Sequence, residues 1–179
     1  MANIDAPNGF TPAYHLYGGT IRPQKLRIAS ATNASIFTGD VVILSSGYVV
    51  QGTATGAPCG VFAGVFYTAA DGTPTYSNMW TADVATLGSA DAEAYVYTDP
   101  AIVYEAQFTA GTPAVSFIGS KYTITTTAGS TNNGRSKEGV TATTSSGIAL
   151  LNRFVDSPSN EIGANARGYF SFPTNIFAV

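Results

Sequence analysis

Short apolar and β-branched runs, each closed by glycine, proline or serine, recur along this chain and limit what it can fold into. No stretch keeps a helical period for more than a turn or two, although 158–164 could hold a short helical turn. The sequence therefore predicts an all-β fold, with one small barrel-like or sandwich-like domain. The expected strands are 26–29, 41–44, 48–50, 61–67, 94–97, 102–106, 116–118, 122–127, 148–154 and 168–172.

The segment GVFAGVFYTAADGTPTYSNMW, residues 60–80, is the most apolar of these regions and contains the chain's only tryptophan. Both faces of its first half carry large side chains, which is typical of a strand covered on two sides or lying at a subunit contact. Asp71-Gly72 accepts the positive φ angles of a tight turn, so the segment predicts a β-hairpin. Its aromatic residues Phe62, Phe66 and Trp80 are candidates for contacts with a partner.

Residues 1–25 are too rich in proline and glycine for a regular element, and the sequence predicts an extended N-terminal arm there. The β-rich domain is expected over 26–179. Phe10, Tyr14 and Tyr17 in the arm need an apolar partner, so we expect them to lie against a neighbouring molecule. A chain beginning near Leu26 is then expected to keep its fold.

The charge content indicates how such a domain stays in solution. Only 11% of the residues are charged, against about 25% in typical soluble domains. We therefore expect much of the surface to be covered by other copies or partners, most simply in a homo-trimer. The alternative is a neutral, threonine-rich β surface. The net charge of −3 and the scattered basic residues argue against nucleic-acid binding.

The cysteine content and the distribution of apolar residues bear on the compartment in which the chain is made and on membrane association. Cys59 is the only cysteine, so no disulfide can form within the chain, and synthesis in a reducing cytoplasm is expected. No signal-peptide pattern and no run approaching about 18 apolar residues is present, so no membrane association is predicted.

Reactive side chains are few and do not form a recognisable motif. His15 has no second histidine and no nucleophile nearby in sequence, and Cys59 lacks basic neighbours that would activate it. Asp91, Glu93 and Asp99 could bind calcium or catalyse glycoside hydrolysis, but their spacing matches no specific ligand array, and charges that block edge-to-edge strand pairing are the favoured interpretation. No phosphate-binding loop occurs, and the tract 123–146 is interpreted as a polar surface loop. We expect no catalytic residue, metal or cofactor.

Four ordered blocks resemble one known family. GVFAGVFYTAADGTPTYSNMW, AYVYTDPAIVYEAQ, GRSKEG and LLNRFVDSPSNEIGANARGYFSF are similar, in that order, to the head-decoration or capsid-cement proteins of tailed bacteriophages, and so is the start PNGFTPAYHLYGG. The similarity extends over most of the chain and includes no catalytic signature.

The resemblance implies a β-rich virion protein on the outer surface of an icosahedral capsid, commonly a trimer at threefold positions, that binds the major capsid protein and stabilises the shell. Such a protein is made in the host cytoplasm and has no active site. The expected contact residues are Phe10, Tyr14, Tyr17, Phe62, Phe66 and Trp80. Two alternatives remain: a head fibre or host-surface adhesin of the virion, and a hydrolase built on Asp91, Glu93 and Asp99.

Overall fold

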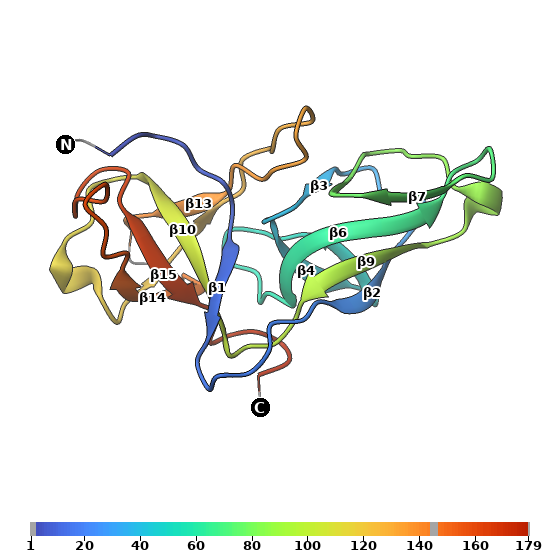
Figure 1. Cartoon of the computed structure of the whole chain (residues 1–179). Helices are drawn as coiled ribbons and strands as arrows, with labels where there is room; N and C mark the ends of the chain where they lie inside the picture. Colours follow the sequence, from blue (N-terminus) through green and yellow to red (C-terminus); the bar gives the residue numbers. More distant parts are fainter. Residues whose placement is uncertain (1–2, 144–146, 179) are drawn as a thin grey trace.

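The computed structural model describes residues 3–143 and 147–178, and within them the chain is all-β with no α-helix. This confirms the predicted fold class. Two groups of strands lie side by side as lobes (Figure 1). The first lobe contains β2 to β9, and the second contains β1 and β10 to β15. Among the described residues, no helix is long and apolar enough to cross a membrane.

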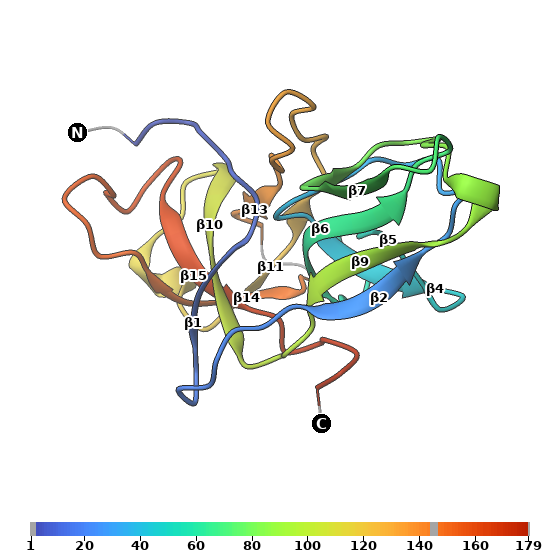
Figure 2. The ribbon, with the colours of Figure 1, turned by 45° about the vertical axis from the view of Figure 1, so that its right-hand side comes forward.

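The first lobe is built on a six-stranded sheet with the order β2-β9-β6-β4-β5, to which β7 adds along β6. The sheet curls until β5 lies beside β2, so it is a nearly closed barrel (Figure 2). A separate pair, β3 and β8, covers one side. The strands are β2 (Gln24–Ile28), β3 (Ile36–Phe37), β4 (Val41–Ser45), β5 (Tyr48–Gln51), β6 (Gly60–Thr68), β7 (Pro74–Ser77), β8 (Met79–Trp80) and β9 (Ala92–Tyr97).

The second lobe is a seven-stranded sheet with the order β11-β14-β15-β10-β13-β12. Strand β10 is long enough for two partners along one edge, because β1 pairs antiparallel with its first half and β13 parallel with its end. The strands are β1 (Thr11–His15), β10 (Ile102–Ala110), β11 (Lys121–Tyr122), β12 (Ile124–Thr125), β13 (Gly139–Thr141), β14 (Ala149–Phe154) and β15 (Arg167–Ser171).

The two hydrophobic clusters, one for each lobe, are connected through shared strands. Val41 packs in the cluster of the second lobe, whereas its neighbour Val42 packs in that of the first. Val61 and Phe62 divide in the same way. Because side chains alternate between the faces of a strand, β4 and β6 each supply both clusters.

The hairpin expected over residues 60–80 is confirmed: β6 pairs with β7 from Val65↔Ser77 to Thr68↔Pro74. The expectation of a strand over 116–118 is wrong. A 3-10 turn covers Val115–Phe117 and Ile118 follows it; the N–H groups of Phe117 and Ile118 bond to the carbonyls three residues back. No helix forms over 158–164, where the chain makes turns and bends.

The N-terminal region also differs from expectation, because residues 11–15 form β1 on the edge of the second sheet. Pro12 fits there since an edge strand needs hydrogen-bond donors on one side only. Phe10 is buried in the chain's own core, against Phe170 and Phe172. The expectation that residues 1–25 hold no regular element is therefore wrong.

The polar tract 123–146 is only partly a loop. It contains β12 and β13, and its middle runs along the first lobe, where Thr38 pairs with Arg135. Residues 144–146 of the tract lie outside the described residues.

Candidate interaction surface

Three of the six expected contact residues lie inside the chain. Phe10, Phe62 and Trp80 are at most 1% exposed. The Trp80 indole N–H donates to the carbonyl of Thr32 at 3.2 Å, and its ring meets Tyr67 edge to face. In this structure these side chains hold the fold together and are not available to a partner.

The exposed expected residue Phe66 belongs to an aromatic strip on the outer face of the six-stranded sheet, formed by Phe66, Tyr76 and Tyr95. Phe66 stands directly opposite Tyr76 across the β6–β7 pair. The rings of Tyr76 and Tyr95 are 5.9 Å apart. Tyr76 lies over Gly64, where a Cβ atom would come within 2.7 Å of the tyrosine hydroxyl. The missing Cβ of the glycine thus leaves room for the end of the tyrosine ring, while 65% of Tyr76 and 36% of Phe66 stay exposed.

Ion pairs border the aromatic strip. The ammonium of Lys25 lies 2.8 Å from the Glu93 carboxylate and 5.8 Å from the centre of the Tyr95 ring. The hydrogen bond to Glu93, followed by its charge, raises the pKa of Lys25. Arg27 faces Asp91 at 3.9 Å in the same row. Aromatic rings with charged neighbours are typical of protein contact surfaces.

Tyr14 lies on the outer face of the other sheet in a compact group with Tyr169 and Arg153. The two rings meet edge to face at 5.5 Å, and the Arg153 guanidinium lies over both, 5.5 and 4.8 Å from their centres. Tyr14 is half-buried by these neighbours. The group gives the second sheet a smaller aromatic surface of its own.

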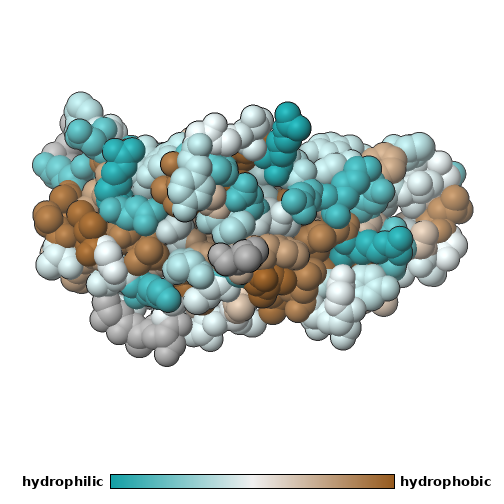
Figure 3. Space-filling view, turned by 90° about the horizontal axis from the view of Figure 1, so that it is seen from below, coloured by the Kyte–Doolittle hydropathy of each residue, from teal (hydrophilic) through white to brown (hydrophobic). Residues whose placement is uncertain are grey.

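Tyr17 is the most exposed of the expected contact residues, at 85%. It lies in the turn after β1, next to the exposed Leu16, whose N–H bonds to the carbonyl of Ala101. The C-terminal segment adds exposed Ile176 and Phe177. Figure 3, which views the molecule from below, shows apolar patches between polar ones on this side.

The three carboxylates considered for hydrolysis do not converge. Asp91 and Glu93 pair with Arg27 and Lys25 at the start of β9, whereas Asp99 lies beyond its other end and accepts from His15 Nε2 at 3.0 Å. Each carboxylate therefore has its own basic partner. The arrangement fits structural ion pairs better than an acid and base flanking a substrate.

His15 and Cys59 have structural surroundings. Nδ1 of His15 accepts the N–H groups of Tyr17 and Gly19, which places its proton on Nε2 and closes the turn after β1. Cys59 is fully buried, and desolvation raises the pKa of its thiol to about 12. Neither residue is placed as a nucleophile or base.

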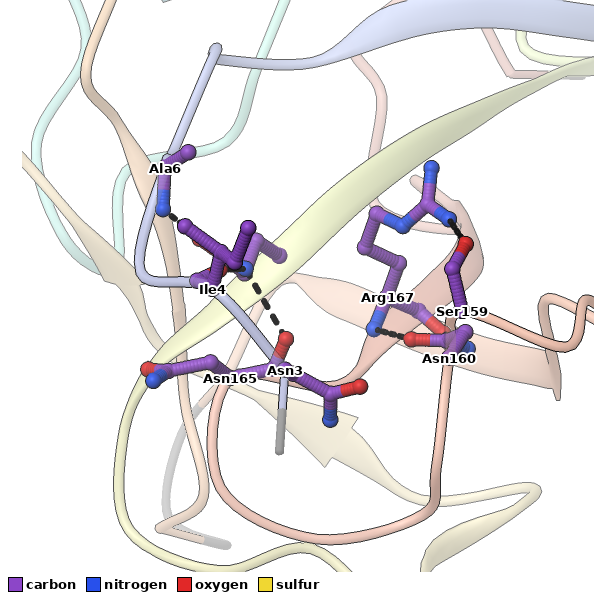
Figure 4. A pocket seen from close by; sticks show the side chains of 8 residues that line it. Asn3, Ile4, Ala6, Ser159, Asn160, Asn165 and Arg167 are labelled. Atoms are coloured by element: carbon purple, nitrogen blue, oxygen red, sulfur yellow. Dashed lines mark hydrogen bonds between the residues drawn. The ribbon is translucent and has the colours of Figure 1, made fainter. Parts of the chain in front are cut away.

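A cavity of about 300 Å³ lies beside the N-terminal segment (Figure 4). Gln107 holds that segment, since its amide accepts the Ala6 N–H at 2.9 Å and donates to the carbonyls of Ile4 and Asn165. The Arg167 side chain binds Glu105 at 2.9 Å. These polar groups are already engaged within the chain, where they hold residues 3–6 in place as one wall of the cavity.

Within the described ranges, no group of three or more histidine, cysteine or acidic side chains is placed to hold a metal ion. No known protein family, curated protein or solved structure matches the chain.

Sequence reasoning missed Tyr76 and Tyr95 as surface residues. Tyr76 follows the Asp71-Gly72 turn, and the predicted hairpin register would have placed it opposite Phe66. Tyr95 gave no local signal, because its position beside Tyr76 depends on the long-range pairing of β9 with β6.

Proposed function

We propose that this chain is a structural, non-enzymatic virion protein that binds the outer surface of an icosahedral phage capsid and stabilises the shell. The ordered sequence blocks described above suggest this class of protein. The major capsid protein is the proposed partner, and a homo-trimer is the proposed form.

The observation that carries the proposal is the aromatic strip. A tyrosine exposed over nearly two thirds of its surface, beside a phenylalanine and a second tyrosine, is costly to leave in water in a chain with few charges. Tyrosine is enriched among residues that dominate binding energy. The bordering Lys25–Glu93 and Arg27–Asp91 pairs supply the polar rim that such contact surfaces have.

The mechanism that follows is multivalent clamping. Each copy in a trimer would present one aromatic strip, so three modest contacts would act together through a high effective concentration. A clamp of this kind resists separation of neighbouring capsid subunits without any chemistry. The adhesin alternative uses the same exposed rings, stacked against sugars instead of protein.

The first prediction tests the strip by co-sedimentation with expanded, undecorated shells of the phage that encodes the chain. Tyr76→Ala should weaken binding at least about 10-fold, because hot-spot tyrosines contribute on the order of 2 kcal/mol each. Leu87→Ala, which removes an exposed apolar side chain outside the strip, should bind as the unmodified protein does. Circular dichroism of both variants checks that the fold is kept.

Three outcomes would count against the proposal. Unmodified protein that stays in the supernatant with shells but binds host cells or glycans would favour the adhesin. Equal binding by Tyr76→Ala and the unmodified chain would remove the strip from the mechanism. Light scattering that shows a monodisperse monomer at micromolar concentration, together with no binding to shells, would exclude the trimeric clamp.

A further inference from the structure

Two fully buried carboxyl groups lie where the lobes meet. Asp40 stands just before β4 of the first lobe, and Glu138 stands just before β13 of the second. Both side chains are 0% exposed. Buried acidic side chains are rare unless they are paired with a base, so this placement needs an explanation.

Each carboxyl group is only half satisfied. One Asp40 oxygen accepts the N–H of Phe37 at 2.8 Å, and one Glu138 oxygen accepts the N–H of Val41 at 2.8 Å. The second oxygen of each, Oδ1 of Asp40 and Oε1 of Glu138, has no hydrogen-bond partner. The Glu138 bond crosses from one lobe to the other, so it joins the two sheets directly.

Among the described residues, no base forms an ion pair with either carboxyl group. The titratable or charged side chains on the adjoining strands and segments are Tyr48, Tyr67, Tyr104, Glu105, Arg135 and Lys137. Tyr104 bonds instead to the carbonyl of Tyr97, and Glu105 pairs with Arg167. Arg135 and Lys137 flank Ser136 in sequence but are exposed. The groups that do face the carboxyls are neutral, chiefly the Ser136 hydroxyl and the Gln51 amide.

This environment favours the protonated forms. Desolvation raises the pKa of Asp40 to about 6. Desolvation, together with the charge of Asp40, raises the pKa of Glu138 well above its ordinary value. Ionising both carboxyl groups at once is unfavourable, because neither charge is hydrated or paired and the two charges repel each other.

The backbone around the pair forms a junction of three segments, 8–10, 37–41 and 134–138. Phe10 N–H bonds to the carbonyl of Gly39, and Ser136 N–H bonds to that of Thr38. Gly9, at φ +70°, lets the first segment approach so closely that a Cβ there would lie 2.5 Å from the Ser136 Cβ. The three segments are tightly packed, so charge repulsion between Asp40 and Glu138 would act directly on the contact between the lobes.

We propose that Asp40 and Glu138 form a pH-sensitive joint between the two lobes, closed while at least one carboxyl is protonated and loosened when both are ionised. The joint is independent of what the surface binds. It would make the chain most rigid in mildly acidic surroundings.

The direction of the pH effect follows from the raised pKa values. In the unfolded chain the two groups titrate near 3.9 and 4.3. In the folded chain the pKa of Asp40 is about 6 and that of Glu138 is raised well above its ordinary value. Their stabilising effect is therefore full below about pH 4 and is lost as the pH rises through these folded-state pKa values. Between pH 5 and 8 the pair should therefore lower the melting temperature as the pH increases.

The second prediction compares melting at pH 5 and pH 8 for the unmodified chain, Glu138→Gln and Asp40→Asn. Each amide can still accept the backbone N–H through its oxygen but can no longer ionise. The unmodified chain should melt several degrees lower at pH 8 than at pH 5, and either variant should lose at least half of that difference. Asp156→Asn, at an exposed carboxylate, should leave the difference unchanged.

Hydrogen exchange on the unmodified chain locates the effect without a variant. After correction for intrinsic rates, amides in 37–41 and 134–138 should exchange at least tenfold faster at pH 8 than at pH 5.5. Amides of 65–67, inside the β6–β7 hairpin, should accelerate clearly less, because they are affected only by the fall in global stability. A uniform change over both regions would contradict a local joint.

Two results would overturn the proposal. The first is an identical pH dependence of melting in the unmodified chain and in both amide variants. The second is a melting temperature that EDTA lowers and calcium restores, since the carboxyl groups would then hold a cation instead of a proton. If both amide variants fail to fold, the exchange measurement alone decides.

Discussion

At the scale of single residues, neighbouring positions on one strand have opposite roles. Val65 and Phe66 are adjacent in β6, yet Val65 is fully buried and Phe66 is exposed enough to meet a partner. Phe62, four residues before Phe66, is again in the core. A bulge between Phe62 and Gly64 in the pairing with β9 breaks the strict alternation, so Phe62 and Phe66 face different surroundings despite their even spacing.

Cys59 gives the third prediction. Its thiol is fully buried and has a pKa raised to about 12, whereas a free cysteine titrates near 8.5. At pH 8 the thiolate fraction should be lower than that of a free thiol by about three orders of magnitude, and burial slows attack further. Ellman's reagent should therefore react slowly with the native chain and rapidly, with one thiol per chain, in guanidinium. Rapid reaction of native protein at pH 8 would show that this part of the core opens readily.

At the scale of elements, local signals predicted most of the strands, including β2, β9, β10 and β14, and missed some whose pairing is decided far away in sequence. Asp71-Gly72 predicted the β6–β7 hairpin, and alternation predicted β4, β5 and β15 within a residue or two. Strands β1 and β13 were not predicted from the sequence, because both pair with β10, which lies far away in sequence. An edge strand containing proline carries almost no local signature, since its hydrogen bonds are decided by a partner.

The candidate surface was predictable only in part for the same reason. Residues 60–67 are apolar on both faces, and that pattern does not say which face meets a partner and which meets the core. The joint between Asp40 and Glu138 gave no signal at all. The bond from Val41 to Glu138 spans 97 positions, so only the folded chain brings the two carboxyl groups together.

Strand β1 gives the fourth prediction, which replaces the expectation that the N-terminal region is dispensable for folding. A chain that begins at Gly19 lacks β1 and Phe10, and losing a buried phenylalanine alone costs about 3–5 kcal/mol. Since total stability is about 5–15 kcal/mol, this chain should melt far below the full-length protein or fail to fold. A chain that begins at Pro7 keeps both features and should melt within a few degrees of it. Thermal melting of the three chains checks this, and equal melting temperatures would show that β1 is dispensable.

At the scale of the whole molecule, the two lobes look separable in outline but share their interior. The side chains of strands β4 and β6 alternate between the two clusters, so neither core can unfold without exposing residues of the other. The junction adds backbone bonds and the Glu138 contact between the lobes. Shared strands of this kind favour unfolding in a single step, because partial unfolding would leave one sheet intact with half of its apolar face exposed to water.

The fifth prediction is therefore a single calorimetric transition, with an enthalpy near 125 kcal/mol at about 60 °C from about 0.7 kcal/mol per residue. Val41→Ala and Val42→Ala form a matched pair, because these adjacent side chains pack in different clusters. Each substitution removes buried methyl groups and should lower the free energy of unfolding by about 2 kcal/mol. The melting temperature of the single transition should then fall by about 4–8 °C. If the lobes unfolded separately, each variant would shift only one of two transitions. A single peak that moves in both variants, with equal calorimetric and van't Hoff enthalpies, requires that the lobes fold as one cooperative unit.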